Sequence, residues 1–285
     1  MKYYFRRYFN RPLVISILIL TIFILISHPK NIQGKGQMSE QINLSDLTIT
    51  VIYDNNDYKP ELKSAWGFSC LISGAEKTIL FDTGGDGNIL LDNMKKLGIS
   101  PDTIEAIFLS HRHGDHTGGL SRLLRHYSAV SVYLPHSFEN AFKKEIIATD
   151  ASVQEVTDSL RTCKGVYSTG ELGNQIIEQS LIIRTDKGLI IITGCAHPGI
   201  VKIVKHAHSL FPEQIFLVMG GFHLTGADNQ VLKDIAMQFQ KMGVRYAGPC
   251  HCSGDNCRTI FSSVFQKNFL KIGTGTTLKL ENLKK

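Results

Sequence analysis

The sequence predicts an α/β fold in which two mixed β-sheets pack together and carry helices on their outer faces. Apolar, β-rich segments joined by short turns occur twice along the chain, and each time they are followed by alternating strands and helices. The chain has 285 residues, is 43% hydrophobic and contains no long internal repeat. This composition excludes collagen-like, low-complexity and wholly disordered proteins, and the length favours one large domain.

The first half opens with strands. Residues 47–53 (LTITVIY) are rich in β-branched side chains, and segments 66–72 and 78–81 flank a turn at 74–77, which predicts a hairpin. After residue 88 the apolar spacing alternates between helical and extended patterns. We expect helices at 88–98, 119–127 and 137–147, and strands at 104–109 and 130–134.

The second half repeats this plan. Segments 180–184 and 189–193 are joined by Thr185-Asp186-Lys187-Gly188, a tight turn that predicts a second hairpin. Residues 149–173 show no period and are expected to form a loop that shapes the pocket. We expect helices at 200–211 and 231–242, and strands at 215–219 and 244–247.

The N-terminus carries an export signal or a membrane anchor over residues 1–30. A cationic segment, 1–12, precedes fifteen uncharged and mostly apolar residues, 13–27. As a helix this run spans roughly 22 Å, less than a bilayer core of about 30 Å, which favours a signal peptide. No small-x-small cleavage pattern follows, so an uncleaved anchor stays open. In either case we expect the rest of the chain to be exported from the cytoplasm. Residues 31–46 are expected to form a linker, and residues 47–285 the folded domain.

The net charge of +6 resides in the N-terminal segment. Six basic residues precede position 36, and no acidic residue precedes Glu40, so the remaining 250 residues sum to zero. A neutral body gives no general attraction for phosphate backbones. We therefore expect a small-molecule substrate rather than nucleic acid, with membrane contact only through an uncleaved N-terminal segment.

The motif that carries chemistry is Ser110-His111-Arg112-His113-Gly114-Asp115-His116, which follows an apolar strand. Its H-x-H-x-D-H pattern places His111 and His113 on one side of an extended strand end, where both imidazoles can bind one metal ion. Gly114 is expected to let the chain turn back, which brings Asp115 and His116 toward a second ion.

Three later histidines also follow strands. His197 lies in GCAHPG, His223 in GGFHL and His251 in GPCHC, each between an apolar segment and small residues. Functional side chains collect at such strand ends, so we expect these histidines to complete the metal site.

Six cysteines leave several interpretations open. Cys195 lies two residues before His197, and Cys250 and Cys252 flank His251, so metal or redox chemistry competes with the interpretation of buried, inert thiols.

These motifs, together with Leu80-Phe81-Asp82-Thr83-Gly84, resemble the metallo-β-lactamase-fold superfamily over residues 47–280. The segments around the later histidines look most like the branch related to dihydropterin aminobenzene-phosphate synthases, and unlike true β-lactamases. The resemblance implies an αββα sandwich and a divalent metal centre of one or two ions, with zinc as the expected metal. It implies that His111, His113 and His197 hold one ion, that Asp115, His116 and His251 hold the other, and that Asp82 braces the site.

One departure concerns the carboxylate that bridges the metals in many superfamily hydrolases. The matching strand end here is Gly220-Gly221-Phe222-His223. His223 is therefore expected to bind metal or substrate instead, and a mononuclear enzyme stays open.

The sequence supports three functions. Hydrolysis of an ester or phosphoester is favoured, with Asp115 as the catalytic carboxylate that orients water or accepts its proton. A transferase that displaces diphosphate from a pterin is the first alternative, and export argues against it. A binding or redox module based on Cys250, Cys252 and Cys257 is the second.

Overall fold

The computed structural model describes residues 41–283. The predicted signal peptide or anchor and most of the predicted linker therefore lie outside the described residues. Within 41–283, no helix is both long enough and apolar enough to cross a membrane.

The first sheet has seven strands. Its antiparallel part joins β13, β1, β2 and β3, and β4, β5 and β6 then continue from β3 in parallel. In sheet order the strands are β13 (Thr277–Lys279), β1 (Thr48–Tyr53), β2 (Ser69–Ser73), β3 (Ile79–Phe81), β4 (Ala106–Phe108), β5 (Ser131–Pro135) and β6 (Ser152–Val156).

The second sheet has six strands. Strands β10, β11 and β12 run parallel, and β9, β8 and β7 extend the sheet in antiparallel pairs. In sheet order they are β12 (Tyr246–Cys250), β11 (Ile215–Gly221), β10 (Gly188–Thr193), β9 (Leu181–Thr185), β8 (Val166–Ser168) and β7 (Arg161–Cys163).

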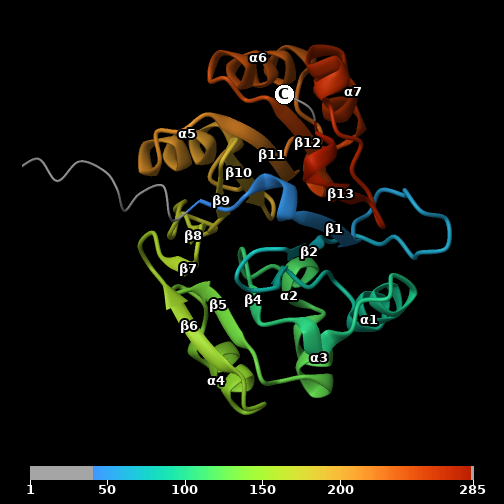
Figure 1. The fold of residues 1–285 in the computed structure, drawn as a ribbon, viewed down its shortest axis with the longest axis vertical. Helices are drawn as coiled ribbons and strands as arrows, with labels where there is room; N and C mark the ends of the chain where they lie inside the picture. Colours follow the sequence, from blue (N-terminus) through green and yellow to red (C-terminus); the bar gives the residue numbers. More distant parts are fainter. Residues whose placement is uncertain (1–40, 284–285) are drawn as a thin grey trace, which may run out of the picture. The chain divides into compact units, whose positions relative to one another are not determined.

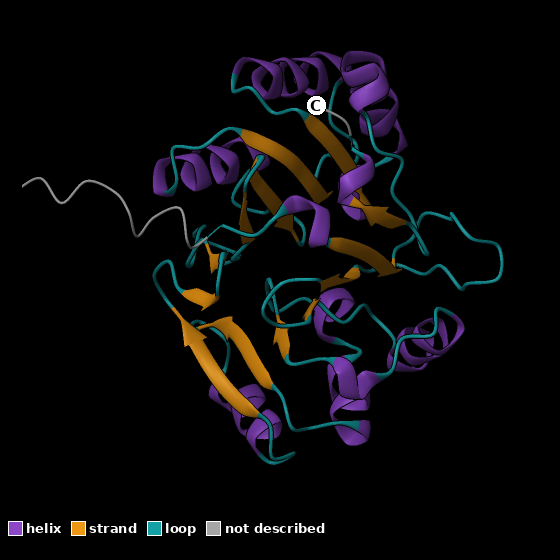
Figure 2. Ribbon diagram, in the orientation of Figure 1, coloured by secondary structure: helices purple, strands orange, loops and turns teal. Residues whose placement is uncertain are grey.

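Helices cover the outer face of each sheet, which confirms the predicted αββα sandwich (Figures 1 and 2). Three pack on the first sheet: α1 (Gly87–Lys96), α3 (Leu120–His126) and α4 (Asn140–Ile147). Three pack on the second sheet: α5 (Ile200–Leu210), α6 (Asn229–Lys241) and α7 (Asp255–Phe265).

Alternation along the strands produces three apolar layers. On β10, Ile190 and Ile192 face the core between the sheets, whereas Leu189 and Ile191 pack under the helices. Because both faces of this strand are covered, its sequence is apolar throughout, as expected for a buried parallel strand. The resulting rigid layers fix the strand ends that carry the site.

The predicted elements agree with the structure except in two regions. The expected loop at 149–173 was wrong, because β6, β7 and β8 lie within it; these strands are short, and β6 is largely exposed, so they lack a clear apolar period. No element was expected in 254–280, where α7 and β13 lie. The described part of the linker packs on the domain: Ile42 and Leu44 are buried, and Ile42 pairs with Thr185.

Candidate metal centre

The predicted site residues gather at the carboxyl ends of parallel strands from both sheets. The H-x-H-x-D-H segment follows β4, whereas His197, His223 and His251 follow β10, β11 and β12. Parallel strands bring their carboxyl ends to one edge of a sheet, which explains why residues 140 positions apart meet.

The H-x-H-x-D-H segment ends in a short helix. His111 Nε2 lies 3.1 Å from His113 Nδ1, so the two imidazoles present neighbouring nitrogens. Gly114 begins the four-residue helix α2 (Gly114–Thr117) rather than a chain reversal, and this turn directs Asp115 and His116 toward a neighbouring point.

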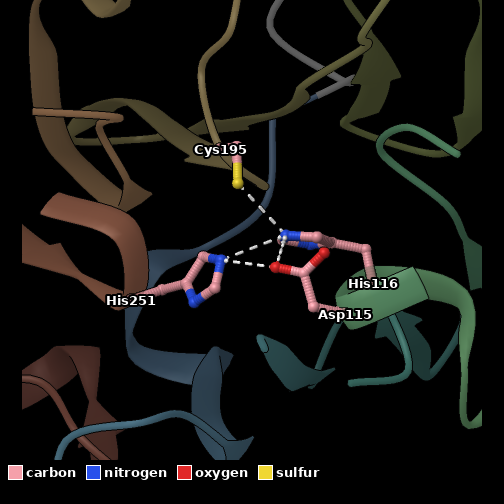
Figure 3. A group of neighbouring side chains, drawn as sticks. All are labelled: Asp115, His116, Cys195 and His251. Carbon is pink, nitrogen blue, oxygen red and sulfur yellow. Dashed lines mark hydrogen bonds and ion pairs between the residues drawn. The ribbon is translucent and has the colours of Figure 1, made fainter. Parts of the chain in front are cut away.

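One group of possible ligands contains Asp115, His116 and His251 (Figure 3). The Nε2 atoms of His116 and His251 are 3.2 Å apart. Asp115 Oδ2 lies 3.2 Å from His251 Nε2 and 3.6 Å from His116 Nε2. These three residues are the predicted ligands of one ion.

A second group surrounds His111 and His197. Their rings are 4.8 Å apart between centroids, and the ring of His113 lies 4.7 Å from His111 and 4.8 Å from His197. His197 Nε2 is buried without a hydrogen-bond partner. An unpaired buried nitrogen is costly unless something binds it, and a cation is a suitable partner.

Asp82 fixes the imidazoles from behind. Its carboxylate lies 2.7 Å from His116 Nδ1 and accepts hydrogen bonds from the Ser110 amide and hydroxyl, each at 2.7 Å. The Ser110 hydroxyl is then an acceptor for His111 Nδ1, at 2.9 Å. This arrangement places the proton on Nδ1 of both histidines and leaves Nε2 free to bind a metal.

His251 has equivalent support that the sequence did not reveal. Its Nδ1 lies 2.9 Å from Asn55 Oδ1, and its backbone N–H donates to Asp54 at 3.1 Å. Both partners follow β1, almost 200 residues earlier, and only the mixed-sheet topology brings them together. Trp66 lies 4.9 Å from the His251 ring between centroids and is 56% exposed.

His223 lies at the rim. Its ring is 4.3 Å from His197 between centroids, and its ring nitrogen groups with the Cys195 and Cys252 sulfurs rather than with Asp115 or His116. The structure thus brings all seven predicted ligand residues to one place, with His223 outside the two main groups.

Glu178 is a site residue that sequence reasoning missed. It is buried and accepts backbone N–H bonds from Cys195 at 3.0 Å, Ala196 at 2.8 Å and His197 at 2.8 Å. Burial raises its pKa to about 7, although these hydrogen bonds oppose the shift. A single glutamate in an irregular segment gave no signal of this role.

Backbone strain is concentrated at the site. Within 41–283, six non-glycine residues have positive φ, and four of them are Asp82, Ala196, His223 and His251. Such conformations persist only where the surrounding structure enforces them, and they are common at functional sites.

The electrostatics favour neutral imidazoles at His111 and His197 and a charged carboxylate at Asp115. Burial, then the neighbouring histidines, lowers the pKa of His111 well below its ordinary value and that of His197 to about 4. For His116 burial also acts downward, but the charge and hydrogen bond of Asp82 outweigh it and raise the pKa. Burial would raise the pKa of Asp115, but the His251 hydrogen bond and the charges of His116 and His251 lower it.

Cys195 and Cys252 were left open by the sequence and lie within the site. Both are buried, and the Cys195 sulfur is 3.2 Å from His116 Nε2 (Figure 3). Among the described residues, neither Cys250 nor Cys257 belongs to a possible ligand group. Cys250 is buried, and Cys257 lies in the apolar layer under α6 and α7. The donors present, imidazole, carboxylate and thiol, together with the unpaired His197 nitrogen, fit a divalent metal.

Comparisons with known proteins show the family to which this chain belongs. Residues 67–205 match the model of the metallo-β-lactamase superfamily. The chain is 30% identical over 279 aligned positions to 7,8-dihydropterin-6-methyl-4-(β-D-ribofuranosyl)-aminobenzene-5'-phosphate synthase of Methanocaldococcus jannaschii, covering 81% of this chain and 95% of that protein.

Solved structures show the same fold. Tm1679, described as a metal-dependent hydrolase of the β-lactamase superfamily, aligns with a TM-score of 0.69 and 28% identity, covering 81% of this chain and 98% of that one. YhfI from Bacillus subtilis, a metallo-β-lactamase fold protein, has a TM-score of 0.62 at 15% identity, covering 81% and 99%.

The fold and site define an enzyme of the metallo-β-lactamase type with candidate ligand groups for divalent metal. This chain belongs to the metallo-β-lactamase superfamily.

Proposed function

We propose that this chain is a hydrolase of an ester or phosphoester that works through two zinc-type ions. The observation that carries the proposal is the convergence of two ligand groups, one around His111 and His197 and one around His116 and His251, at a single edge of the sandwich. Paired groups of this kind suit hydrolysis, in which one centre positions the nucleophile and the other the leaving oxygen.

The ligands follow from the donor set. His111, His113 and His197 would hold one ion, and Asp115, His116 and His251 the other. Imidazole and carboxylate donors suit zinc. When bound, the ions supply Lewis acidity that polarises the scissile group and makes coordinated water acidic.

Asp115 has one role that its surroundings favour. Its lowered pKa keeps the carboxylate ionised at neutral pH, because the hydrogen bond and charges of the two histidines outweigh burial. A group so acidic is a weak proton acceptor, since catalytic bases work best with a pKa near the operating pH. Asp115 therefore acts chiefly by ligating and by orienting the attacking water.

The adjoining surface suits a small anionic substrate. A pocket of about 570 Å³ is lined by His197, His223, Lys202 and Lys205, and its other wall is apolar. Lys202 and both histidines also line the neighbouring hollow. Lysines beside the metal groups attract phosphate, so a phosphoester is favoured over a neutral ester. A larger hollow of about 770 Å³, near Gln240 and Lys267, contains none of these histidines.

A second function is supported by the relative from Methanocaldococcus jannaschii. That protein is a synthase of an aminobenzene phosphate, and the resemblance covers 95% of its length. A transferase of this kind would use the same ligand groups and the same lysines to bind a pterin diphosphate, whose diphosphate leaves as an aromatic carbon takes its place.

The functions separate in one series of assays on the full chain. We expect two zinc ions per chain and chelator-sensitive cleavage of a chromogenic phosphodiester or ester, abolished by His113→Ala. His136→Ala is the matched control, because the His136 imidazole is exposed and its Nδ1 lies 2.6 Å from Glu155, away from both ligand groups.

Other outcomes identify the alternatives. Turnover only with a pterin diphosphate and an aromatic amine would replace the hydrolase by the transferase. No turnover on any of these substrates with metal bound would leave a binding or redox module.

We also propose that the body is exported, on the basis of the cationic and apolar N-terminal sequence alone. Cell fractionation with N-terminal sequencing tests this. A chain found in the cytoplasm with Met1 intact would refute it.

A further inference from the structure

The sulfur of Cys195 is shared by the possible ligand groups. It lies within 4.8 Å of the ligand atoms of Asp115, His116 and His251. It also lies within 4.8 Å of the ligand atoms of His111 and His197, which form the other group. We propose that the Cys195 thiolate bridges the two metal ions, in the role that a carboxylate has in many superfamily hydrolases. This inference rests on the metal binding proposed above and identifies a ligand of that site.

The spacing around Cys195 matches a coordination sphere. Around a tetrahedral zinc with bonds of about 2.0 to 2.3 Å, ligand atoms are about 3.3 to 3.6 Å apart. His116 Nε2 lies 3.2 Å from the Cys195 sulfur and 3.2 Å from His251 Nε2, and Asp115 Oδ2 completes the group at 3.2 and 3.6 Å from the two imidazoles. The Cys195 sulfur therefore lies at ligand spacing from His116 and belongs to this group as well as to the group of His111 and His197.

The backbone holds the thiol in this position. The Cys195 and Ala196 amides both donate to the buried Glu178 carboxylate, and the side chain of Cys195 is 3% exposed. Gly194 lies so close to Ser110 that an added Cβ would meet the hydroxyl oxygen at 2.1 Å. The sulfur thus reaches the site from a segment that has little freedom to move.

Charge balance also favours a thiolate here. Within 41–283, Asp115 is the one carboxylate that belongs to a possible ligand group. With one carboxylate among the ligands, two divalent ions leave a positive charge within the ligand groups that a second anionic ligand offsets. Coordination releases the thiol proton to solvent, and the resulting thiolate supplies the second negative ligand.

Cys252 is less well placed for this role. Its sulfur belongs only to the group with Cys195 and His223, and it lies 3.6 Å from the Cys195 carbonyl oxygen. Cys252 therefore serves as the comparison variant for Cys195.

Cobalt substitution tests the bridge directly. The metal-free full chain is loaded with Co²⁺ under reducing conditions, and the near-ultraviolet band of thiolate-to-cobalt charge transfer is recorded. We expect this band in the wild type, in Cys252→Ser and in the remote control Cys163→Ser, and its loss in Cys195→Ser. Cys195→Asp should bind two ions without the band, because a carboxylate can bridge. Absence of the band in the wild type, or its survival in Cys195→Ser, would overturn the proposal.

A second measurement needs no variant at position 195. X-ray absorption of the zinc-loaded wild type and Cys252→Ser should show a sulfur at about 2.3 Å from zinc, averaging one per ion, because a bridging sulfur is shared by both. No sulfur shell, or a shell lost in Cys252→Ser, contradicts the bridge. The failures are distinguishable: inactivity with the sulfur shell present removes only the proposed hydrolysis, whereas activity without it removes only the bridge.

Discussion

His116 Nδ1 and Asp82 Oδ2 are 2.7 Å apart, and both side chains are completely buried. Asp82 also binds the Ser110 hydroxyl, which in turn contacts His111. One carboxylate therefore orients an imidazole from each ligand group. It acts through these residues and is not itself a member of any possible ligand group among residues 41–283.

Replacing Asp82 with Asn should weaken metal binding in both groups. An amide can offer its N–H₂ to His116 Nδ1 and thereby favour the wrong tautomer, so we expect a loss of on the order of 10- to 100-fold in zinc affinity. Titration against a competing chelator measures this. Asp92→Asn, at an exposed position paired only with Lys96, is the control; equal affinities in the two variants would contradict the bracing role of Asp82.

Gly194 and Gly114 provide a matched pair of small substitutions at the same site. A Cβ at position 194 would meet Ser110 Oγ at 2.1 Å, whereas a Cβ at position 114 meets nothing within 4 Å. We expect Gly194→Ala to lower the free energy of unfolding by about 1–3 kcal/mol and to reduce metal binding, and Gly114→Ala to leave both nearly unchanged. Urea unfolding checks this, and similar stabilities would show that the 194 segment can relax.

Glu178 should be a stabilising residue rather than a ligand. The Glu178 carboxylate accepts hydrogen bonds from three backbone N–H groups, whereas a glutamine side chain would offer them a single carbonyl oxygen. Glu178→Gln should therefore lower the free energy of unfolding by roughly 1–3 kcal/mol. Thermal and urea unfolding at pH 8 measure the effect against Glu145→Gln, an exposed position on α4. If the glutamine variant retained full stability, the anchoring role would be lost.

The sequence indicated the fold and the histidines because both depend on local patterns. β-Branched side chains predicted β1, the tight turn at 185–188 predicted the hairpin of β9 and β10, and the change from an apolar strand to small or polar residues indicated His111, His197 and His251. These signals are contained in a few consecutive residues, so they can be recognised in the sequence without knowledge of the tertiary structure.

The supporting shell could not be predicted for the opposite reason. Asn55 reaches His251 from 196 positions away, and Glu178 holds the 195–197 backbone from 17 to 19 positions away through contacts that leave no spacing pattern. Cys195 was visible as a thiol near a histidine, but its place in both ligand groups depends on how β4, β10 and β12 end at one edge.

The pKa of His197 leads to a prediction about acid stability of the metal-free protein. Burial, with the charges of His223 and His113, lowers this pKa from the ordinary 6.5 to about 4. Between these values the unfolded chain binds a proton at position 197 that the folded chain does not, so acid favours unfolding. The contribution of neutral His197 is present above pH 6.5 and disappears as the pH falls through about 4.

Because the raised pKa of His116 acts in the opposite sense, the wild type must be compared with His197→Gln, whose side chain does not titrate. We expect the loss of unfolding free energy between pH 7 and pH 5 to be smaller in His197→Gln, and equal losses in the two proteins would show that the imidazole is not held neutral.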